Sequence, residues 1–247
     1  MRTILQLNMI LFLILSYIIV VNCLVITDFT SESSRASNFK RKNNFNSQFS
    51  DFGTSVTLLR HANTHNNMNN IWTGQLDPGI LDLNHPKVKM GNYDLVLCSS
   101  SLRCKQTLDI LKFDNKPEII FDDCFLEAGY GDLTGKKKND DIFMREFFNR
   151  PPDSNIYVSE SLFEAGLRSY FGFSLLSDRY TLFNSKILVL SHKNTLKGLW
   201  CFLNLDYILT QEDNKSIDQI EIDINNFLET KEIPSFENLT PYNVDLF

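Results

Sequence analysis

The chain has 247 residues, of which 43% are hydrophobic and 22% charged, and this ordinary globular composition excludes wholesale disorder. A net charge of −6 argues against a sequence-independent nucleic-acid binder, which needs a basic surface to displace counterions. Five cysteines are too few for a disulfide scaffold, and no cysteine or histidine cluster has zinc spacing. We therefore expect a globular domain with no nucleic-acid partner and no metal site.

The first 52 residues indicate a targeting signal and a tether. An uncharged apolar run from Met9 to Val21 follows a positive region at Arg2, and small residues stand near Cys23, as in a secretory signal peptide. We predict a signal peptide over residues 1–23, so that the protein enters the secretory pathway or is secreted. The alternative is a membrane anchor formed by residues 4–26, which are enough to span a bilayer. The polar stretch 24–52 predicts a disordered linker, and residues 53–247 form the folded domain.

Apolar runs and helical patterns alternate along this domain. Buried strands are predicted over Ser55–Leu59, Tyr93–Cys98, Glu118–Phe121 and Lys186–Leu190. Helical stretches follow from Leu102 to Leu111 and from Asn194 to Leu203, and Gln219–Ile224 alternates as a more exposed strand does. The aromatic stretch Tyr170 to Phe173 is interpreted as core. This alternation predicts an α/β fold whose sheet is covered on both faces.

Four cysteines lie in the predicted domain: Cys98, Cys104, Cys124 and Cys201. No spacing among them indicates a disulfide pairing, so we interpret them as small buried apolar side chains, and two disulfides are the alternative in an oxidising compartment.

Cationic residues follow the predicted strands. Arg60 and His61 come directly after one strand, Arg103 opens the helix after another, and His192 follows a third. In open α/β sheets, ligands bind outside the carboxyl ends of the strands. Two guanidinium groups and two imidazoles that meet there would form a cradle for an oxyanion, and a phosphoryl group suits it.

Short motifs recur in unbroken order from about Thr54 to about Leu205. The first is Arg60-His61-Ala62, and the last is His192-Lys193-Asn194-Thr195-Leu196-Lys197. Between them lie Asn63 to Asn67, Trp72-Thr73-Gly74-Gln75, Ser99 to Thr107, Glu127 with Tyr130, Gly131, Leu133, Gly135 and Lys138, then Arg145-Glu146, Pro151-Pro152, Glu160-Ser161-Leu162 and Arg168. This series resembles the histidine phosphatase superfamily, and within it the cofactor-dependent phosphoglycerate mutases.

The resemblance implies a three-layer α/β/α fold with a mostly parallel central sheet, and a phosphohistidine mechanism. His61 would attack the phosphorus and carry the phosphoryl group. Arg60, Arg103 and His192 would hold its oxygens, and Glu127 would act as general acid and base.

Substrate contacts are implied in the same way. Asn67, Thr73 and Gly74 would contact the phosphoryl group, and the phosphoglycerate would be held by Tyr130, Lys138, Arg145 and Asn194. The resemblance implies a small phosphorylated substrate, 2,3-bisphosphoglycerate as phosphoryl primer, and no metal or nucleotide cofactor. It also leaves room for a homodimer, and a membrane contact follows only if the N-terminal segment stays uncleaved.

Three residues depart from the family pattern. Ala62 and Lys193 replace the glycines after the two histidines, and Glu146 replaces one of two paired arginines. Three functions therefore compete. Phosphoglycerate mutase activity ranks first, because the substrate-binding positions match. An exported phosphatase is favoured by Glu146 and by the export signal, and a non-catalytic binding protein by Ala62 and Lys193.

Overall fold

A five-stranded sheet forms the centre of the fold. The computed structural model describes residues 54–138, 160–180, 185–210 and 233–244. The strand order is β5-β3-β6-β1-β7, with β1 at Ser55–Arg60, β3 at Leu95–Ser99, β5 at Glu118–Asp122, β6 at Lys186–Ser191 and β7 at Pro241–Val244. The predictions for residues 1–23, 24–52 and Gln219–Ile224, and those for Arg145 and Glu146, lie outside the described residues.

The first four predicted strands are present, and they pair in parallel. The predicted burial of Glu118–Phe121 is wrong, because β5 is an edge strand and its Ile119 and Phe121 are 41% and 47% exposed. β1 pairs with β6, β6 with β3, and β3 with β5, whereas β7 runs antiparallel to β1 at the edge. Every residue of β3 is buried, as is every residue of β1 and β6 except the first. Such continuous burial explains their unbroken apolar sequences, because both faces of the sheet are covered.

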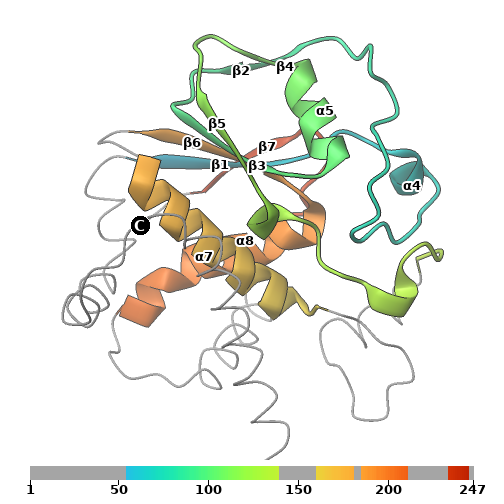
Figure 1. Ribbon diagram of the computed structural model, residues 1–247. Coiled ribbons are helices and arrows are strands. Elements are labelled where there is room, and N and C mark those ends of the chain that lie inside the picture. The colour runs from blue at the N-terminus through green and yellow to red at the C-terminus, as the bar shows by residue number, and fades with distance from the viewer. Residues whose placement is uncertain (1–53, 139–159, 181–184, 211–232, 245–247) are drawn as a thin grey trace, which may run out of the picture. The chain divides into compact units, whose positions relative to one another are not determined.

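Helices cover the two faces of the sheet. Helix α5 (Leu102–Ile110) lies on one side, and α7 (Leu162–Tyr180) and α8 (Lys193–Thr210) lie together on the other (Figure 1). The expected three-layer α/β/α arrangement with a mainly parallel sheet is therefore confirmed.

Neighbouring residues of one strand serve different cores, because successive side chains point to opposite faces. Leu58 packs in the cluster that α7 and α8 cover, together with Phe173 and Leu196. Leu59 packs in the opposite cluster, with Cys98 and Cys104.

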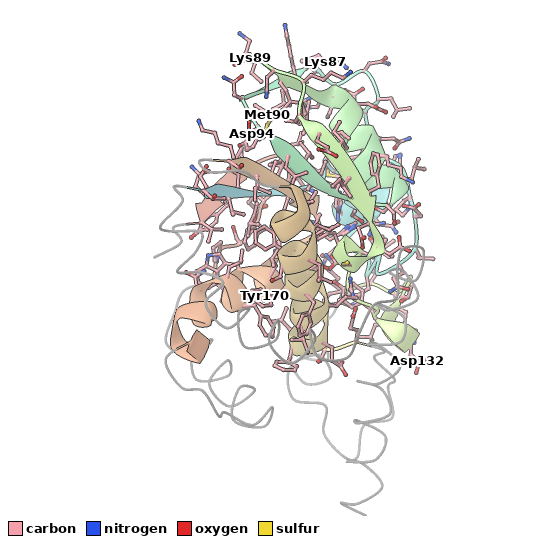
Figure 2. All side chains as sticks on the ribbon, turned by 60° about the vertical axis from the view of Figure 1, so that its left-hand side comes forward. Lys87, Lys89, Met90, Asp94, Asp132 and Tyr170 are labelled. Carbon is pink, nitrogen blue, oxygen red and sulfur yellow. The ribbon has the colours of Figure 1, made fainter. Side chains whose placement is uncertain are left out.

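Helices α7 and α8 cross at two glycines. A Cβ atom on Gly198 would lie 2.5 Å from Gly166 Cα and 2.9 Å from the Leu162 carbonyl oxygen. Farther along the contact, Tyr170 (Figure 2) stacks on Phe202 with ring centroids 5.6 Å apart. Phe173 is fully buried as predicted, but Phe171 is 52% exposed, so the aromatic stretch belongs to the core only in part.

Shorter elements connect the sheet. They are helix α4 (His65–Met68), strands β2 (Val88–Gly91) and β4 (Leu111–Phe113), which pair with each other, and two 3-10 turns, η2 (Asp123–Phe125) and η3 (Gly131–Leu133). Leu111 was expected to continue the helix, yet α5 ends at Ile110 and Leu111 begins β4. Leu111 pairs with Val88 of β2, and this explains the difference. The helical spacing of apolar residues carries no information about a partner strand from another part of the chain.

The cysteines match the simpler expectation. All four in the described residues are free, and Cys98, Cys104 and Cys201 are buried while Cys124 is half-buried. None of the helices in the described ranges is long and apolar enough to cross a bilayer.

Candidate active site

The strand register brings the two motif histidines together. Arg60 pairs with Ser191 at the ends of β1 and β6, and the His61 amide donates to the Ser191 carbonyl at 3.0 Å. The next residues, His61 and His192, therefore lie side by side, with ring centroids 5.1 Å apart. His61 and His192 directly follow the last residues of the parallel strands β1 and β6. They therefore lie at the carboxyl-end edge of the sheet, where open α/β folds bind ligands.

A cavity of about 330 Å³ opens beside His61. This volume lies at the small end of the range for small-molecule sites. Nine of the predicted site residues line it: Arg60, His61, Asn67, Thr73, Arg103, Glu127, Tyr130, Lys138 and Asn194. Gly74 and His192 adjoin the cavity without lining it, and Arg145 lies outside the described residues.

The His61 ring is fixed in the form that a nucleophile needs. Its Nδ1 lies 2.7 Å from the Ala62 carbonyl oxygen. A carbonyl can only accept, so Nδ1 carries the proton and Nε2 keeps its lone pair. Burial lowers the pKa of His61 well below its ordinary value, and the charges of Arg103 and Arg60 lower it further. The ring is therefore neutral and able to attack phosphorus at physiological pH.

Two buried polar atoms beside His61 have no hydrogen-bond partner among the described residues. They are Arg60 Nε and Thr73 Oγ1, and both side chains line the cavity. Arg60 is 7% exposed and Thr73 is 9% exposed. Buried donors are almost always satisfied, so these two are available to hydrogen-bond a ligand in the cavity.

His192 supports Arg103 from beneath the cavity. Arg103 Nε donates to His192 Nδ1 at 3.1 Å, and His192 Nε2 lies 2.9 Å from Ser99 Oγ. Burial lowers the pKa of His192 well below its ordinary value, and Arg103 is the next cause, so the ring is neutral. Both ring nitrogens thus have partners within the protein, and a direct contact of His192 with the phosphoryl oxygens stays a prediction.

The guanidinium of Arg103 is held on its other side by a loop. Its Nη2 donates to the Gly74 carbonyl at 2.9 Å, and Nη1 donates to the Leu76 carbonyl at 2.5 Å. Gly74 has a φ of +50°, and a Cβ there would lie 3.2 Å from the Tyr130 ring. Gly74 therefore orients Arg103 through its backbone, a role that requires glycine at this turn.

Glu127 is anchored in a buried loop after η2. Its Oε1 accepts from the Ala128 amide at 3.0 Å and from the amide and hydroxyl of Thr195, both at 3.3 Å. Three donors on one oxygen fix the carboxylate at the cavity wall. Beside it, Asn194 Nδ2 donates to the Tyr130 hydroxyl at 2.6 Å.

Local bonds aim two further side chains at the cavity. Asn67 Oδ1 accepts from the amide and the hydroxyl of Thr64, each at 3.1 Å, which leaves its Nδ2 as the donor for a ligand. The Lys138 ammonium lies 5.3 Å from the centre of the Trp72 ring and also lines the cavity, whereas Lys136 and Lys137 are exposed. The lysine run is thus divided between the site and the surface.

The two glycine replacements in the described part are accommodated. Ala62 has no positive φ; its methyl group packs near Ile80 and Ile110, and its amide donates to Thr107 Oγ1 at 2.9 Å. Lys193 lines the cavity but leaves it open.

Sequence reasoning missed several cavity residues. Asn70, Ile71, Trp72 and Lys197 also line the space. Lys197 could have been predicted as a cavity residue from the sequence. It stands four residues after Lys193 on a predicted helix, and such residues share a face. The loop residues carried no periodic signal. Among the described residues, no group of three or more His, Cys, Asp or Glu side chains is placed to hold a metal ion.

Comparison with known proteins agrees with the motif series. The family model of the histidine phosphatase superfamily (branch 1) matches residues 56–229. The 2,3-bisphosphoglycerate-dependent phosphoglycerate mutases of Brucella canis and Brucella melitensis are 27% identical, over 66% of this chain and 89% of theirs.

Solved structures of similar fold include two phosphatases. A phosphoserine phosphatase mutant from Entamoeba histolytica in complex with phosphoserine is 16% identical, with a TM-score of 0.48 over 66% of this chain and 87% of that one. A mycobacterial glucosyl-3-phosphoglycerate phosphatase is 17% identical, with a TM-score of 0.46 over 60% of this chain and 78% of that one.

Proposed function

Because this chain belongs to the histidine phosphatase superfamily, we propose that it transfers a phosphoryl group through His61 and interconverts 2- and 3-phosphoglycerate. One observation carries the proposal: His61 keeps its Nδ1 proton on the Ala62 carbonyl, so Nε2 is the nucleophile, and it lies in a cavity with two unpartnered donors. That is the arrangement an in-line attack on a phosphate requires.

The transfer has two balanced steps. His61 Nε2 forms a bond to phosphorus while the bond from phosphorus to the substrate oxygen breaks, and Glu127 gives its proton to that leaving oxygen. In the second step Glu127 takes a proton from the acceptor hydroxyl, whose oxygen forms a bond to phosphorus while the bond from phosphorus to His61 Nε2 breaks and its electron pair returns to the ring. Arg60 and Arg103 balance the charge that spreads over the equatorial oxygens.

The choice of a phosphoglycerate rests on the pocket residues and on the relatives. Tyr130, Lys138 and Asn194 line the cavity at positions that match the mutase motifs. The related Brucella proteins are named as mutases dependent on 2,3-bisphosphoglycerate. We infer that this compound primes His61, since a mutase that works through a phosphohistidine must carry a phosphoryl group before its first turnover.

Hydrolysis is the second candidate, and Glu146 favours it. This carboxylate stands where the mutase motif has an arginine for the substrate carboxylate, and it would repel a phosphoglycerate. Water would then accept the phosphoryl group from His61. The third alternative, a non-catalytic protein, was based on Ala62 and Lys193, and neither residue closes the cavity.

A product assay separates these functions. The protein is mixed with 3-phosphoglycerate, with and without a trace of 2,3-bisphosphoglycerate, and 2-phosphoglycerate and free phosphate are both measured. We expect 2-phosphoglycerate, formed faster with the primer. His61→Ala should abolish it, and His85→Ala, a histidine outside the cavity, should not. Free phosphate as the only product would show that the protein is a phosphatase and not a mutase. The absence of any product from this substrate would contradict the proposal.

A further inference from the structure

Two lysines of one helix face enter the cavity beside the phosphoryl site. Helix α8 begins at Lys193, directly after His192, and Lys197 follows one turn later. Residues four apart lie above one another on a helix, and both side chains line the same cavity as His61. These lysines are not required by the phosphoryl chemistry proposed above, which Arg60 and Arg103 serve.

The position of this pair is electrostatically unfavourable in the absence of a ligand. Both lysines stand in the first two turns of α8, near the positive end of the helix dipole, and that helix has no acidic residue in its first turn. Like charges four residues apart also repel. Neither side chain has a hydrogen bond or an ion pair with any of the described residues. Burial lowers the pKa of Lys197, and the charge of Lys193 is the next cause.

An anion between the two ammonium groups would relieve both effects. We propose that Lys193 and Lys197 form a second anion subsite, which binds a carboxylate or a second phosphate of the phosphoester substrate. This inference rests on the proposed function, because it assumes that His61 and Arg60 hold the phosphoryl group of that substrate.

Lys193 sets this pair apart from the family motif, whereas Lys197 stands where the motif has arginine, which is also a cation. Lys193 stands where the motif has glycine, and Glu146 stands where it has the second of two arginines. The sequence has thus lost one cation that would read the substrate carboxylate and gained another at the start of α8. The lysine pair adds positive charge to a cavity in which Glu127 is the single carboxylate among the described lining residues.

Two ligands of equal backbone test the subsite. 3-Phosphoglycerate and glycerol 3-phosphate differ only in that a carboxylate replaces a hydroxymethyl group. The rate constant for phosphorylation of His61, divided by the half-saturating concentration, is measured for both by rapid quench. Their ratio defines the selectivity for the anionic ligand. A third ligand, 1,3-propanediol bisphosphate, offers a second phosphate in place of the carboxylate.

We expect Lys193→Gln and Lys197→Gln each to lower this selectivity by about 10-fold or more, the equivalent of one charge-assisted hydrogen bond. The larger loss, with 3-phosphoglycerate or with the bisphosphate, identifies the preferred anion. Lys136→Gln, at an exposed lysine outside the cavity, should leave both rates at the wild-type level. An equal change on all ligands, or no change, would overturn the subsite.

Calorimetric binding of the same ligands keeps this test independent of catalysis. If wild-type protein binds 3-phosphoglycerate more tightly than glycerol 3-phosphate, and the lysine variants lose that preference, the subsite stands even where no phosphohistidine forms. In that case only the proposed function fails. If wild-type protein has no preference for the anionic ligand, the subsite is refuted whether or not His61 is phosphorylated.

Discussion

Two buried neutral histidines link the stability of this protein to pH. His61 and His192 are 4% and 0% exposed, and burial is the main cause that lowers the pKa of each. A lowered pKa means that the unfolded chain takes up protons before the folded protein does. The contribution of these neutral rings to the free energy of unfolding is therefore fully present above pH 6.5, the ordinary pKa of histidine in the unfolded chain. It is lost as the pH falls below that value.

We predict a decline in the free energy of unfolding below pH 6.5 of up to about 1.4 kcal/mol per pH unit for each ring. His192→Asn should make the slope shallower by one such contribution, and His65→Ala, at an exposed histidine, should keep the wild-type slope. The slope is measured for each protein by urea unfolding at pH values from 7.5 to 5 in phosphate-free buffer. An identical slope in His192→Asn would show that this ring is protonated in the folded protein.

The residues at the site were the easiest to predict. His61, Arg60 and Arg103 stand directly after or near strand ends, and the topology of a parallel sheet brings such positions to one edge. The orphaned donors on Arg60 and Thr73, and the support of Arg103 by His192, could not be predicted. They depend on side-chain directions that the spacing of residues does not specify.

At the scale of elements, α7 braces the loop that carries Glu127. Arg168 binds both oxygens of Glu160 at 2.8 Å and donates to the carbonyls of Cys124 at 2.6 Å and Leu126 at 3.2 Å. Glu160 in turn accepts from the Gly129 amide at 3.2 Å. The loop on both sides of Glu127 is thus tied to one helix.

We predict that Arg168→Lys lowers kcat at least 10-fold with a smaller change in KM, because a lysine cannot replace the two-pronged contacts that keep the acid in place. The conservative substitution Glu160→Gln should lower kcat less than Arg168→Lys does. Ser161→Ala removes the hydroxyl that accepts from the Glu164 amide at the start of α7, so it should reduce stability by about 1 kcal/mol without changing kcat. A kcat for Arg168→Lys equal to that of wild type would show that the brace does not position Glu127.

The crossing of α7 and α8 depends on the absence of side chains at Gly166 and Gly198. Gly198→Ala places a methyl group within 3 Å of the backbone of the other helix, where no side chain can move away. We predict a net loss of about 1–3 kcal/mol in the free energy of unfolding, although alanine favours a helix. Phe171→Ala, on the exposed side of α7, should change it by less. A Gly198→Ala protein as stable as wild type would contradict this close packing.

The sequence predicted long buried elements better than short paired ones. Continuous apolar runs predicted the buried strands β1, β3 and β6, and a helical pattern after His192 predicted α8. A shorter apolar run predicted β5, but its exposure at the edge of the sheet could not be predicted from that run. β2, β4 and β7 are three or four residues long and exist because of their partners, so their own residues give little signal. β7 even begins with Pro241, which fits its place at the edge of the sheet.

At the scale of the whole molecule, an acidic chain gathers cations at one place. The net charge is −6, yet the cavity lining in the described part of the chain has two arginines and three lysines against one carboxylate. Segments more than a hundred residues apart in the sequence supply these groups. Positive potential confined to a small cavity attracts a small phosphorylated ligand without making the surface a general polyanion binder.

Trapping the covalent intermediate tests the account most directly. The protein is incubated briefly with 2,3-bisphosphoglycerate labelled at phosphorus, denatured in alkali, where phosphohistidine survives, and digested for peptide mapping. We predict one acid-labile phosphoryl group, on Nε2 of His61, which His61→Ala abolishes and His85→Ala retains. Label that persists in His61→Ala, or that maps to another residue, would contradict the claim that the chain carries phosphoryl groups on this ring.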